Sequence, residues 1–326
     1  FSQNQLYNFN LIFLVKKYHS DLKASWDKFV SISENATFLF YRDYMDYHSD
    51  RFEDFSILIY KNESVVGLIP ANRSKNTVFS HQGLTYGGLL LETNFNAIYL
   101  EEIMPAVKTF YKNNGVTDFQ LKSFPSSYPQ FQSTLPFSFF KNSKTKMITT
   151  HKSLAIDFSK EVKFHKTKLK HQRKGLERGL EIRLDNDFKT FWTEVLTPML
   201  KERFQTKPVH SLEEIEQLHS FFPNKILQYN VYLDDKILGG ITVYNKGSIV
   251  KSQYSATILE GQKNYAIDVL FLYLIEHFKN SGAQFFCMGT VTTNDTLGYN
   301  PGLLKQKLEL GCDIYDQQII NFPLDD

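Results

Sequence analysis

A chain of 326 residues that is 42% hydrophobic and 22% charged has an ordinary globular composition, which excludes a disordered protein. Because 37 basic and 35 acidic side chains leave a net charge of only +2, we expect no global attraction to DNA or to other nucleic acids. Any affinity for phosphate must therefore come from a local basic patch.

Two features of the sequence bear on the cellular compartment in which the protein is expected. Cys287 and Cys312 stand far apart in apolar contexts, without the spacing of metal ligands, which favours a reducing, cytoplasmic location. The most apolar stretch, residues 265–278, contains Asp268 and Glu276 and is too short to cross a bilayer. We therefore predict no integral membrane segment.

The first half of the chain alternates strand patterns with one helix. We expect strands at SILIY, SVVGLIPANR and TVFSHQGLTYGGLLL, then a helix over residues 103–111 and a strand at VTDFQL. Gly115, between that helix and that strand, is expected to form a left-handed C-terminal cap.

The second half predicts the same elements in the same order. Its strands are expected at QYNVYL, KILGGITVYN and SIVKSQYSATI, followed by a helix over residues 267–278, a cap at Gly282 and the strand AQFFCM. Four matching elements with closing glycines indicate a duplication. The predicted fold class is α/β (α+β), with two units that each hold a mixed, mainly antiparallel sheet flanked by helices. We place the domains at residues 1–150 and 151–326.

The segment before the second set of strands differs from the corresponding part of the first half. It predicts a basic helix, the strand LEIRL, a helix over residues 188–204, and a last helix. Ser211 followed three residues later by Glu214 predicts a capping box at the start of this last helix.

The stretch LKHQRKGLERGLEI, residues 169–182, concentrates positive charge. On a helical wheel one flank of this helix gathers four basic side chains, those of Lys166, Lys170, Arg173 and Lys174. Gly175 and Gly179 each cost a helix roughly 1 kcal/mol relative to alanine, so they indicate a close backbone approach or a helix end. The helix is either a solvated surface face or a grip for an anionic substrate.

The run KTKLKHQRKGLERGLEIRLDNDFKTFW resembles the start of the second domain in FemAB-like proteins. The resemblance continues through residues 210–244, 252–290 and 300–311, and the first half contributes HQGLTYGGLLL, which is similar to a glycine-marked strand of that family. FemAB-like proteins belong to the GNAT superfamily and carry two GNAT-like units in tandem. This organisation agrees with the duplication.

The resemblance implies transfer of an acyl or aminoacyl group from acyl-CoA or aminoacyl-tRNA to an amine. The partners would be a small-molecule or nucleotide-linked amine acceptor and, for one donor class, tRNA. Lys170, Arg173 and Lys174 would then hold an anionic substrate. The second domain would bind the donor, and the first domain, whose ETNFNAI lacks the glycine of a donor loop, would be structural or acceptor-binding.

Aminolysis of an ester or thioester passes through an oxyanion, so the site needs hydrogen-bond donors at the carbonyl and a route for protons. In GNAT folds, the strand before the donor-binding turn splays from its neighbour and offers backbone N–H groups. In this sequence that strand is SQYSATI, and Gln253, Tyr254 and Ser255 are the candidates to line the gap. Alternatively, Tyr254 packs against the sheet.

A coenzyme A site in this superfamily carries a glycine-rich loop at a helix start, where amides bind the pyrophosphate. The corresponding stretch GQKNYA has Gly261, Asn264 and Ala266 at the three key places, and only Ala266 agrees. Asn264 can still adopt a positive φ, and we expect the helix N-terminus to remain an anion site. The mismatch argues against acyl-CoA as the donor more strongly than it argues against acyl transfer as the reaction.

Near the C-terminus, Thr290 ends a strand and a short helix follows with Lys305 and Lys307. The resemblance places a lysine of this helix close to the donor, and it leaves open which of the two. Alternatively, both are ordinary surface lysines.

The candidates for a general base are Glu202, His210 and Asp268. Asp268 lies in an apolar helix, where it is either buried with a partner or placed on the exposed face. His210 either lines the site or is solvated in its loop.

Other chemistries lack their motifs. The sequence has no paired histidines that would predict a metal site, no GxSxG elbow and no GxxxxGK[ST] loop. Our hypothesis is an N-acyltransferase that modifies an amino sugar or peptide amine in cell-envelope or polysaccharide synthesis. The alternatives are an aminoacyl-tRNA-dependent aminoacyltransferase of the peptidoglycan type and a degenerate protein that only binds a ligand.

Overall fold

The computed structural model describes residues 13–92, 95–128, 136–293 and 296–325. The chain forms two compact units. The first unit comprises residues 1–124, 129–149 and 318–326. The second comprises residues 125–128 and 150–317.

The first unit holds two groups of strands around a helix. One group is an antiparallel sheet in the order β1 (Phe13–Lys17), β3 (Ile57–Lys61), β4 (Ser64–Ile69) and β7 (Leu90–Leu91). The other follows the order β8 (Asp118–Lys122), β6 (Thr77–Phe79), β5 (Asn72–Ser74) and β2 (Glu53–Asp54). Its helices are α1 (Lys23–Ile32), α2 (Arg42–Met45) and α3 (Leu100–Asn113).

The core of the first unit forms where α3 meets these strands. Val107 and Tyr111 from α3 pack with Ile57, Ile59 and Phe119 from β3 and β8, and all five are fully buried. These residues recur at helical spacing in α3 and alternate along β3, which is why the segments fold as an amphipathic helix against a sheet.

The prediction of one strand through TVFSHQGLTYGGLLL is wrong. Only Thr77–Phe79 and Leu90–Leu91 are strands, and the residues between them form turns and irregular structure. His81 adopts a φ of +68°, which a strand does not allow. Gly87 lies so close to the Ser80 carbonyl oxygen that an added Cβ would be 2.1 Å from it.

The second unit is built on a sheet in the order β10 (Glu181–Leu184), β11 (Ile226–Leu233), β12 (Lys236–Asn245), β13 (Ile249–Thr257), β14 (Phe285–Thr290) and β9 (Lys146–Asp157). All neighbouring strands are antiparallel except β13 and β14, which are parallel. The predicted mixed, mainly antiparallel sheet is therefore confirmed.

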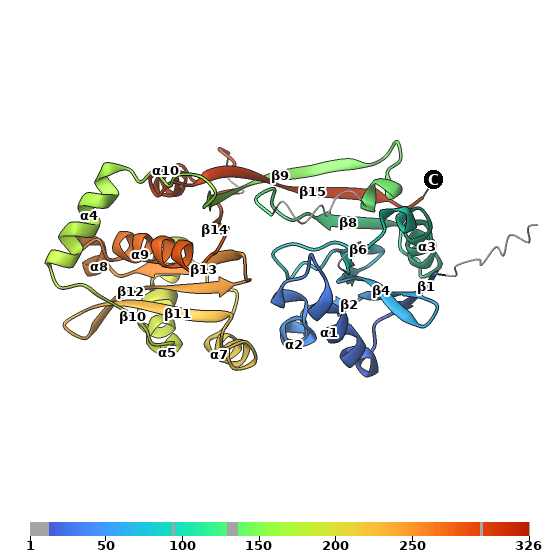
Figure 1. The fold of residues 1–326 in the computed structure, drawn as a ribbon, viewed down its shortest axis with the longest axis horizontal. Helices are drawn as coiled ribbons and strands as arrows, with labels where there is room; N and C mark the ends of the chain where they lie inside the picture. Colours follow the sequence, from blue (N-terminus) through green and yellow to red (C-terminus); the bar gives the residue numbers. More distant parts are fainter. Residues whose placement is uncertain (1–12, 93–94, 129–135, 294–295, 326) are drawn as a thin grey trace, which may run out of the picture. The chain divides into compact units, whose positions relative to one another are not determined.

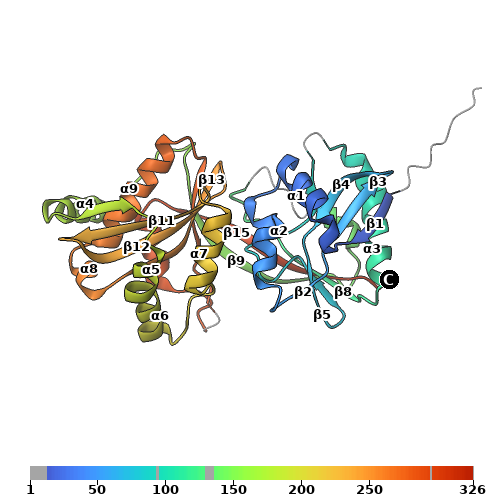
Figure 2. The same ribbon diagram turned by 90° about the horizontal axis from the view of Figure 1, so that it is seen from below.

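Helices cover both faces of this sheet (Figures 1 and 2). On one face lie α4 (Lys166–Glu177), α8 (Leu259–Lys263) and α9 (Ala266–Asn280). On the other lie α5 (Phe188–Thr190), a π-helical segment η6 (Phe191–Leu196), α6 (Thr197–Phe204) and α7 (Leu212–Phe221). After β14 the chain forms α10 (Pro301–Glu309) and then β15 (Asp313–Pro323), which continues from the second unit into the first.

The duplication is visible in how the matching strands pair. In the first unit, β6 and β8 are parallel neighbours on either side of α3 in the sequence. In the second unit, β13 and β14 are parallel neighbours on either side of α9. Gly115 and Gly282 close these helices with φ values of +72° and +86°, as a left-handed cap requires.

Candidate active site in the second unit

The parallel strands β13 and β14 part within the second unit. Among the described residues their pairing covers only three positions and ends where Lys251 meets Cys287. Both strands then continue, β13 to Thr257 and β14 to Thr290. β13 stays paired with β12 on its other side as far as Thr257. Alternate N–H groups of β13 beyond Lys251 therefore face the side from which β14 has departed.

A β-bulge lies where the two strands part. The register with β12 runs from Val243 opposite Ser252 to Thr242 opposite Tyr254, so Gln253 is the extra residue. Such bulges bend a strand and turn its peptide groups away from the regular ladder. The next residue along the chain after Tyr254 is Ser255, which is exposed. Gln253 and Ser255 follow directly on the last pair between β13 and β14, and their role at a donor carbonyl stays a prediction.

Lys307 belongs to α10, and its buried side chain reaches the end of β14. Its ammonium donates to the carbonyl oxygen of Thr290 at 3.0 Å and approaches that of Gly289 at 3.5 Å. Burial lowers the pKa of Lys307 to about 8. At neutral pH the Lys307 amine is therefore mostly protonated, and it places a positive charge beside the parted strands. Lys305, by contrast, is exposed and lies 4.0 Å from Glu309, so the structure separates two lysines that the sequence left equivalent.

Tyr254 and His210 form a bonded pair on the face of the sheet that η6 covers. The distance from His210 Nδ1 to Tyr254 Oη is 2.5 Å, and the backbone N–H of His210 donates to the same hydroxyl at 3.2 Å. Burial raises the pKa of Tyr254 to about 12. His210 is 3% exposed, so the expectation of a solvated loop histidine is wrong. The side chain of Tyr254 packs against the sheet, as the alternative expected, and it follows directly after Gln253, the bulge residue at which the strands part.

The π-helical segment supplies the residue that holds this pair. Trp192 Nε1 donates to the carbonyl oxygen of His210 at 3.1 Å, and the indole packs edge-on against Tyr254 with ring centroids 5.2 Å apart. π-helical turns occur mostly as local insertions, often at functional sites. Nothing in the sequence pattern distinguishes this turn from an α-helix, and Trp192 was not among the predicted residues.

The start of α9 contains a buried charge cluster. The Asp268 carboxylate is bonded by Lys168 Nζ at 2.9 and 3.1 Å and lies 2.7 Å from His171 Nδ1. Asp268 is 6% exposed and Lys168 is 7% exposed. The alternative that Asp268 sits on an exposed helix face is therefore wrong. A buried carboxylate with these partners balances charge and orients α4 on α9.

The donor-loop residues differ from the prediction at the same helix start. Asn264 has a φ of −98° and the positive φ of +64° belongs to Tyr265, so the expected conformation is displaced by one residue. Gly261 lies inside α8, where an added Cβ would be 2.2 Å from Thr257 Oγ1. Ala266 is the first residue of α9 and is fully buried.

The residues around this helix start do not fit a pyrophosphate. The His171 ring stacks on Tyr265 at 4.1 Å, and Arg178 donates to the Lys263 carbonyl oxygen at 2.7 Å. Gly175 of α4 lies so close that an added Cβ would be 3.2 Å from the Asn264 carbonyl oxygen. The first turn of α9 already carries the buried Asp268 carboxylate, which is bonded to Lys168 and occupies this helix start. The expected anion site is therefore filled by the chain itself.

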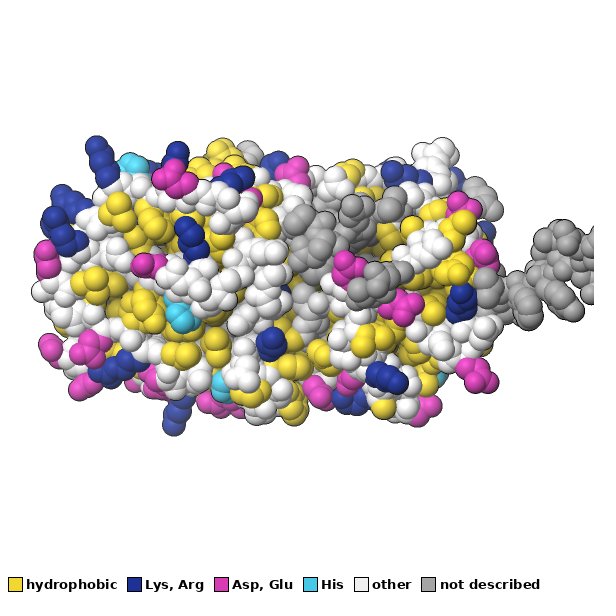
Figure 3. Space-filling model, viewed as in Figure 1, with side chains coloured by type: hydrophobic (Ala, Val, Ile, Leu, Met, Phe, Trp, Pro, Cys, Tyr) yellow, Lys and Arg dark blue, Asp and Glu magenta, His cyan; other side chains and the backbone are white. Residues whose placement is uncertain are grey.

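The remaining predicted residues lie on α4, on α6 and at the end of β14, and most of them are exposed. Lys170 and Arg173 project from α4 into solvent, where Arg173 lies 3.6 Å from Glu177, and Lys174 is half-buried. Lys and Arg side chains gather over α4 at the left of Figure 3. Glu202 is exposed on α6, whereas His210 and Tyr254 form their pair in the buried layer. Thr290 is exposed at the end of β14, with Oγ1 donating to the Lys152 carbonyl oxygen at 3.0 Å.

Two of the residues that sequence reasoning missed had a readable signal. Lys168 and His171 lie seven and four residues before Gly175, and this spacing places them on the helix face that the glycine brings against α9. The basic flank that the sequence analysis singled out lies on the other side of α4, which faces away from α9. The close approach expected of one glycine is confirmed at Gly175, and the helix end is confirmed at Gly179, which has a φ of +87°.

Within the described ranges, no group of three or more His, Cys, Asp or Glu side chains is arranged to hold a metal ion. Among the helices of those same ranges, none is both long and apolar enough to cross a membrane. Cys287 and Cys312 are buried free thiols, and burial raises the pKa of each.

No family model matches the sequence, and no curated protein matches it. Solved structures do match. FemX aligns over 94% of this chain and 97% of its own with a TM-score of 0.67 at 12% identity. A tandem GNAT protein from the clavulanic acid biosynthesis pathway aligns over 97% and 99% with a TM-score of 0.51 at 11% identity.

This chain has the FemAB-like fold, with two GNAT-like units in tandem. A further structure with this likeness is the C-terminal domain of a putative lysylphosphatidylglycerol synthetase from Agrobacterium fabrum, which has a TM-score of 0.53 at 11% identity over 78% of this chain and 81% of its own. At these identities the comparisons establish the FemAB-like architecture alone.

Proposed function

We propose that this protein transfers an acyl or aminoacyl group from an activated donor to an amine of an amino sugar or peptide. The observation that carries the proposal is the parting of β13 from β14 at a bulge, with the Lys307 ammonium at the end of β14. In such a site the donor carbonyl enters between the strands. Backbone N–H groups of β13 and the Lys307 charge stabilise the oxyanion that forms on it.

Proton transfer is the second requirement of aminolysis. The attacking amine loses a proton as the C–N bond forms, and the leaving oxygen or sulfur gains one. The Tyr254–His210 pair holds a proton between Oη and Nδ1 and is our candidate for this exchange. Asp268 is committed to Lys168 and His171, so we assign it a structural role.

The donor class is the finer part of the proposal. Because the residues at the start of α9 do not fit a pyrophosphate, we route no step through coenzyme A. A second candidate, an aminoacyl-tRNA donor, is favoured by the exposed basic face of α4, which carries Lys166, Lys170 and Arg173. A role in cell-envelope or polysaccharide synthesis and a cytoplasmic location remain part of this proposal through the FemAB-like resemblance.

The experiment that tests the proposal is an assay with both donor classes. Purified protein is incubated with acyl-CoA thioesters or charged tRNA and with amino-sugar or peptide amines, and products are identified by mass. We expect a product with one donor class, and about 10²-fold or more loss in Lys307→Met. The control Lys279→Met removes an exposed lysine near the end of α9. No product with either donor class would contradict the proposal and favour a protein that only binds a ligand.

A further inference from the structure

Gln253 carries a buried oxygen without a partner. It is the extra residue of the β-bulge in β13 and follows Lys251, where the pairing with β14 ends, by two positions. Gln253 as a whole is half-buried, but its Oε1 is buried, and no hydrogen-bond donor reaches this oxygen in the part of the chain that the structure describes. A buried acceptor without a donor destabilises a fold, so native proteins keep few of them. One that is kept beside a candidate active site indicates a ligand that supplies the donor.

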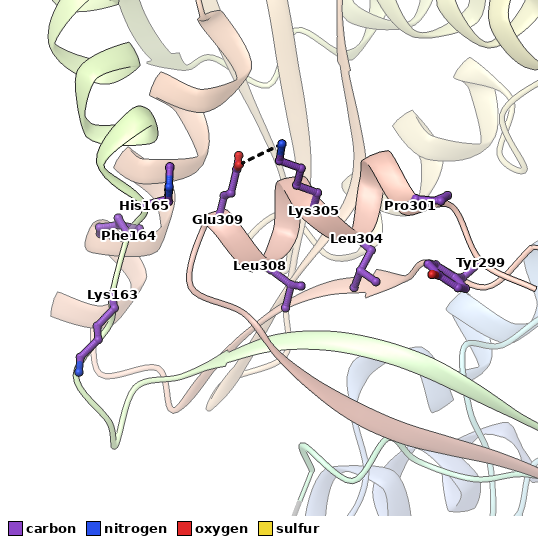
Figure 4. A pocket seen from close by; sticks show the side chains of 9 residues that line it. All are labelled: Lys163, Phe164, His165, Tyr299, Pro301, Leu304, Lys305, Leu308 and Glu309. Atoms are coloured by element: carbon purple, nitrogen blue, oxygen red, sulfur yellow. Dashed lines mark ion pairs between the residues drawn. The ribbon is translucent and has the colours of Figure 1, made fainter. Parts of the chain in front are cut away.

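A groove with a volume of about 500 Å³ elsewhere in the second unit has paired charges instead. It lies between the segment before α4 and α10, and among its lining residues the ammonium of Lys305 is 4.0 Å from the carboxylate of Glu309 (Figure 4). Lys163, which also lines it, lies 3.6 Å from Glu161. Because these charges are matched within the protein, the bulge of β13 gives the clearer sign of a ligand.

The amide of Gln253 is oriented by Tyr254. Burial raises the pKa of Tyr254 to about 12, while hydrogen bonds from the His210 backbone and from the Gln253 side chain lower it. A hydrogen bond lowers the pKa of a phenol when it is donated to the phenol oxygen, because it then stabilises the anion. In a glutamine amide only the nitrogen donates. Nε2 of Gln253 is therefore the end at the Tyr254 hydroxyl, and Oε1 is the end left to accept from a ligand.

The attacking group of the proposed reaction would meet both residues, since Gln253 and Tyr254 are adjacent at the bulge. An uncharged primary amine has one lone pair and two N–H groups. The lone pair attacks the donor carbonyl, and one N–H supplies the proton that the Tyr254–His210 pair takes up. The second N–H stays on the nitrogen and needs an acceptor. An alcohol has a single O–H, which the same proton route uses.

We propose that Gln253 Oε1 accepts the second N–H of the attacking amine and that this bond makes the site select amines over hydroxyl groups. The inference rests on the proposed function, in which the Tyr254–His210 pair carries the proton. As the new C–N bond forms, the C–O or C–S bond of the donor breaks, and the proton moves through that pair to the leaving oxygen or sulfur. The amide product keeps the N–H that Gln253 holds. An ester product has no such hydrogen, so a hydroxyl acceptor leaves Oε1 unpaired and is rejected.

Two matched pairs of acceptors test the selectivity, glucosamine with glucose and alanyl-glycine with lactoyl-glycine. With the donor class that gives product, we expect kcat/KM of the amine to exceed that of its hydroxyl counterpart by about 10²-fold or more. Gln253→Met should reduce this preference at least about tenfold by slowing the amine. Gln253→Glu keeps an oxygen acceptor and should keep the preference, and Gln217→Met, which changes an exposed glutamine of α7, is the control. Equal rates for both acceptors in the original chain, or an unchanged preference in Gln253→Met, would overturn the inference.

Urea denaturation without substrate tests the unpaired oxygen by itself. Gln253→Met removes a buried acceptor that has no donor among the described residues, so the urea midpoint should stay the same or rise. A lower midpoint would show that the Gln253 amide is bonded within the fold, and it would overturn the inference while the transfer reaction stands. Failure of every donor to give product would instead remove the proposed function and this inference with it.

Discussion

The two units contain the same parallel strand pair and treat it in opposite ways. In the first unit, the chain after β6 stays bonded to β8: Ser80 N–H donates to the Gln120 carbonyl oxygen and Gly87 N–H to that of Lys122, both at 2.9 Å. In the second unit, the pairing of β13 with β14 ends at Lys251. One copy of the fold is closed by its own backbone, and the other leaves backbone groups for a substrate. The difference supports our assignment of the donor site to the second unit.

The units also differ at the start of the helix between these strands. In the first unit, Asn96 caps the turn before α3 by accepting from the Ile98 N–H at 3.1 Å. In the second unit, α9 begins with the buried Lys168–Asp268 ion pair. A neutral cap satisfies the helix locally, whereas the ion pair ties α9 to α4.

Removing one member of that ion pair is expected to have the largest effect. Lys168→Met leaves the buried Asp268 carboxylate without its strongest partner, which should lower the free energy of unfolding by about 3 to 5 kcal/mol. Urea denaturation measures this change. The double variant Lys168→Met/Asp268→Leu should regain most of the loss because no buried charge remains. A single variant as stable as the original chain would show that the pair does not hold α4 on α9.

Lys307→Met is expected to have the next largest effect. Loss of one positive donor at the oxyanion should lower kcat about 10² to 10³-fold, with Lys279→Met as the control. A rate close to that of the control would remove Lys307 from the site.

The pH dependence sharpens the assignment of Lys307. Because burial lowers its pKa to about 8, the ammonium is present below that pH and lost above it. We expect kcat to fall as the pH rises through about 8. Lys307→Arg stays protonated throughout, so its pH profile should lack this descending limb. A limb that persists in the arginine variant belongs to another group.

Tyr254→Phe tests the proton route and is expected to lower kcat by about 10²-fold, because the hydroxyl bonded to His210 is lost while the ring remains. Trp192→Phe should give a smaller loss, since the indole only holds the His210 carbonyl oxygen. Urea denaturation separates the two roles. Tyr254→Phe should lower kcat with little change in the free energy of unfolding, whereas an unchanged rate and a lower free energy of unfolding in the Trp192 variant would assign Trp192 to packing alone.

Gly87→Ala is expected to have the smallest effect and to confine it to stability. Its Cβ would meet the Ser80 carbonyl oxygen at 2.1 Å, so the closed pair of the first unit must shift, at about 1 to 3 kcal/mol. Urea denaturation should show this loss, while donor-dependent kcat stays unchanged. A large loss of kcat at full stability would mean that the first unit takes part in donor chemistry.

The sequence predicted best what depends on local pattern. The strand KILGGITVYN coincides with β12, and the capping box of Ser211 and Glu214 is present with both hydrogen bonds. Apolar periodicity and capping act within a few residues, so they can be read along the chain. The single strand predicted at residues 77–91 failed because His81 adopts a φ of +68°, and the residues between Phe79 and Leu90 form turns and irregular structure.

The parts of the site that were missed depend on packing between distant segments. Lys168 is buried because Gly175 allows α4 to approach α9, and neither fact is visible in the local charge pattern. The positive φ fell on Tyr265 instead of the predicted Asn264, because the Asn264 side chain bonds the Glu260 carbonyl oxygen at the end of α8. Which of two nearby lysines was buried also followed from the orientation of α10 on β14.

Hydrogen exchange of the backbone tests most directly whether the second unit admits a donor carbonyl between its strands. The amides of residues 252–257 and 288–290 are compared with those of residues 77–91, with and without two donor analogues. The analogues are S-acetonyl-CoA and an RNA minihelix bearing an amide-linked 3′-alanyl group. We predict that one analogue slows exchange in β13 and β14 and leaves residues 77–91 unchanged. Slowed exchange confined to residues 77–91, or no change with either analogue, would contradict the account.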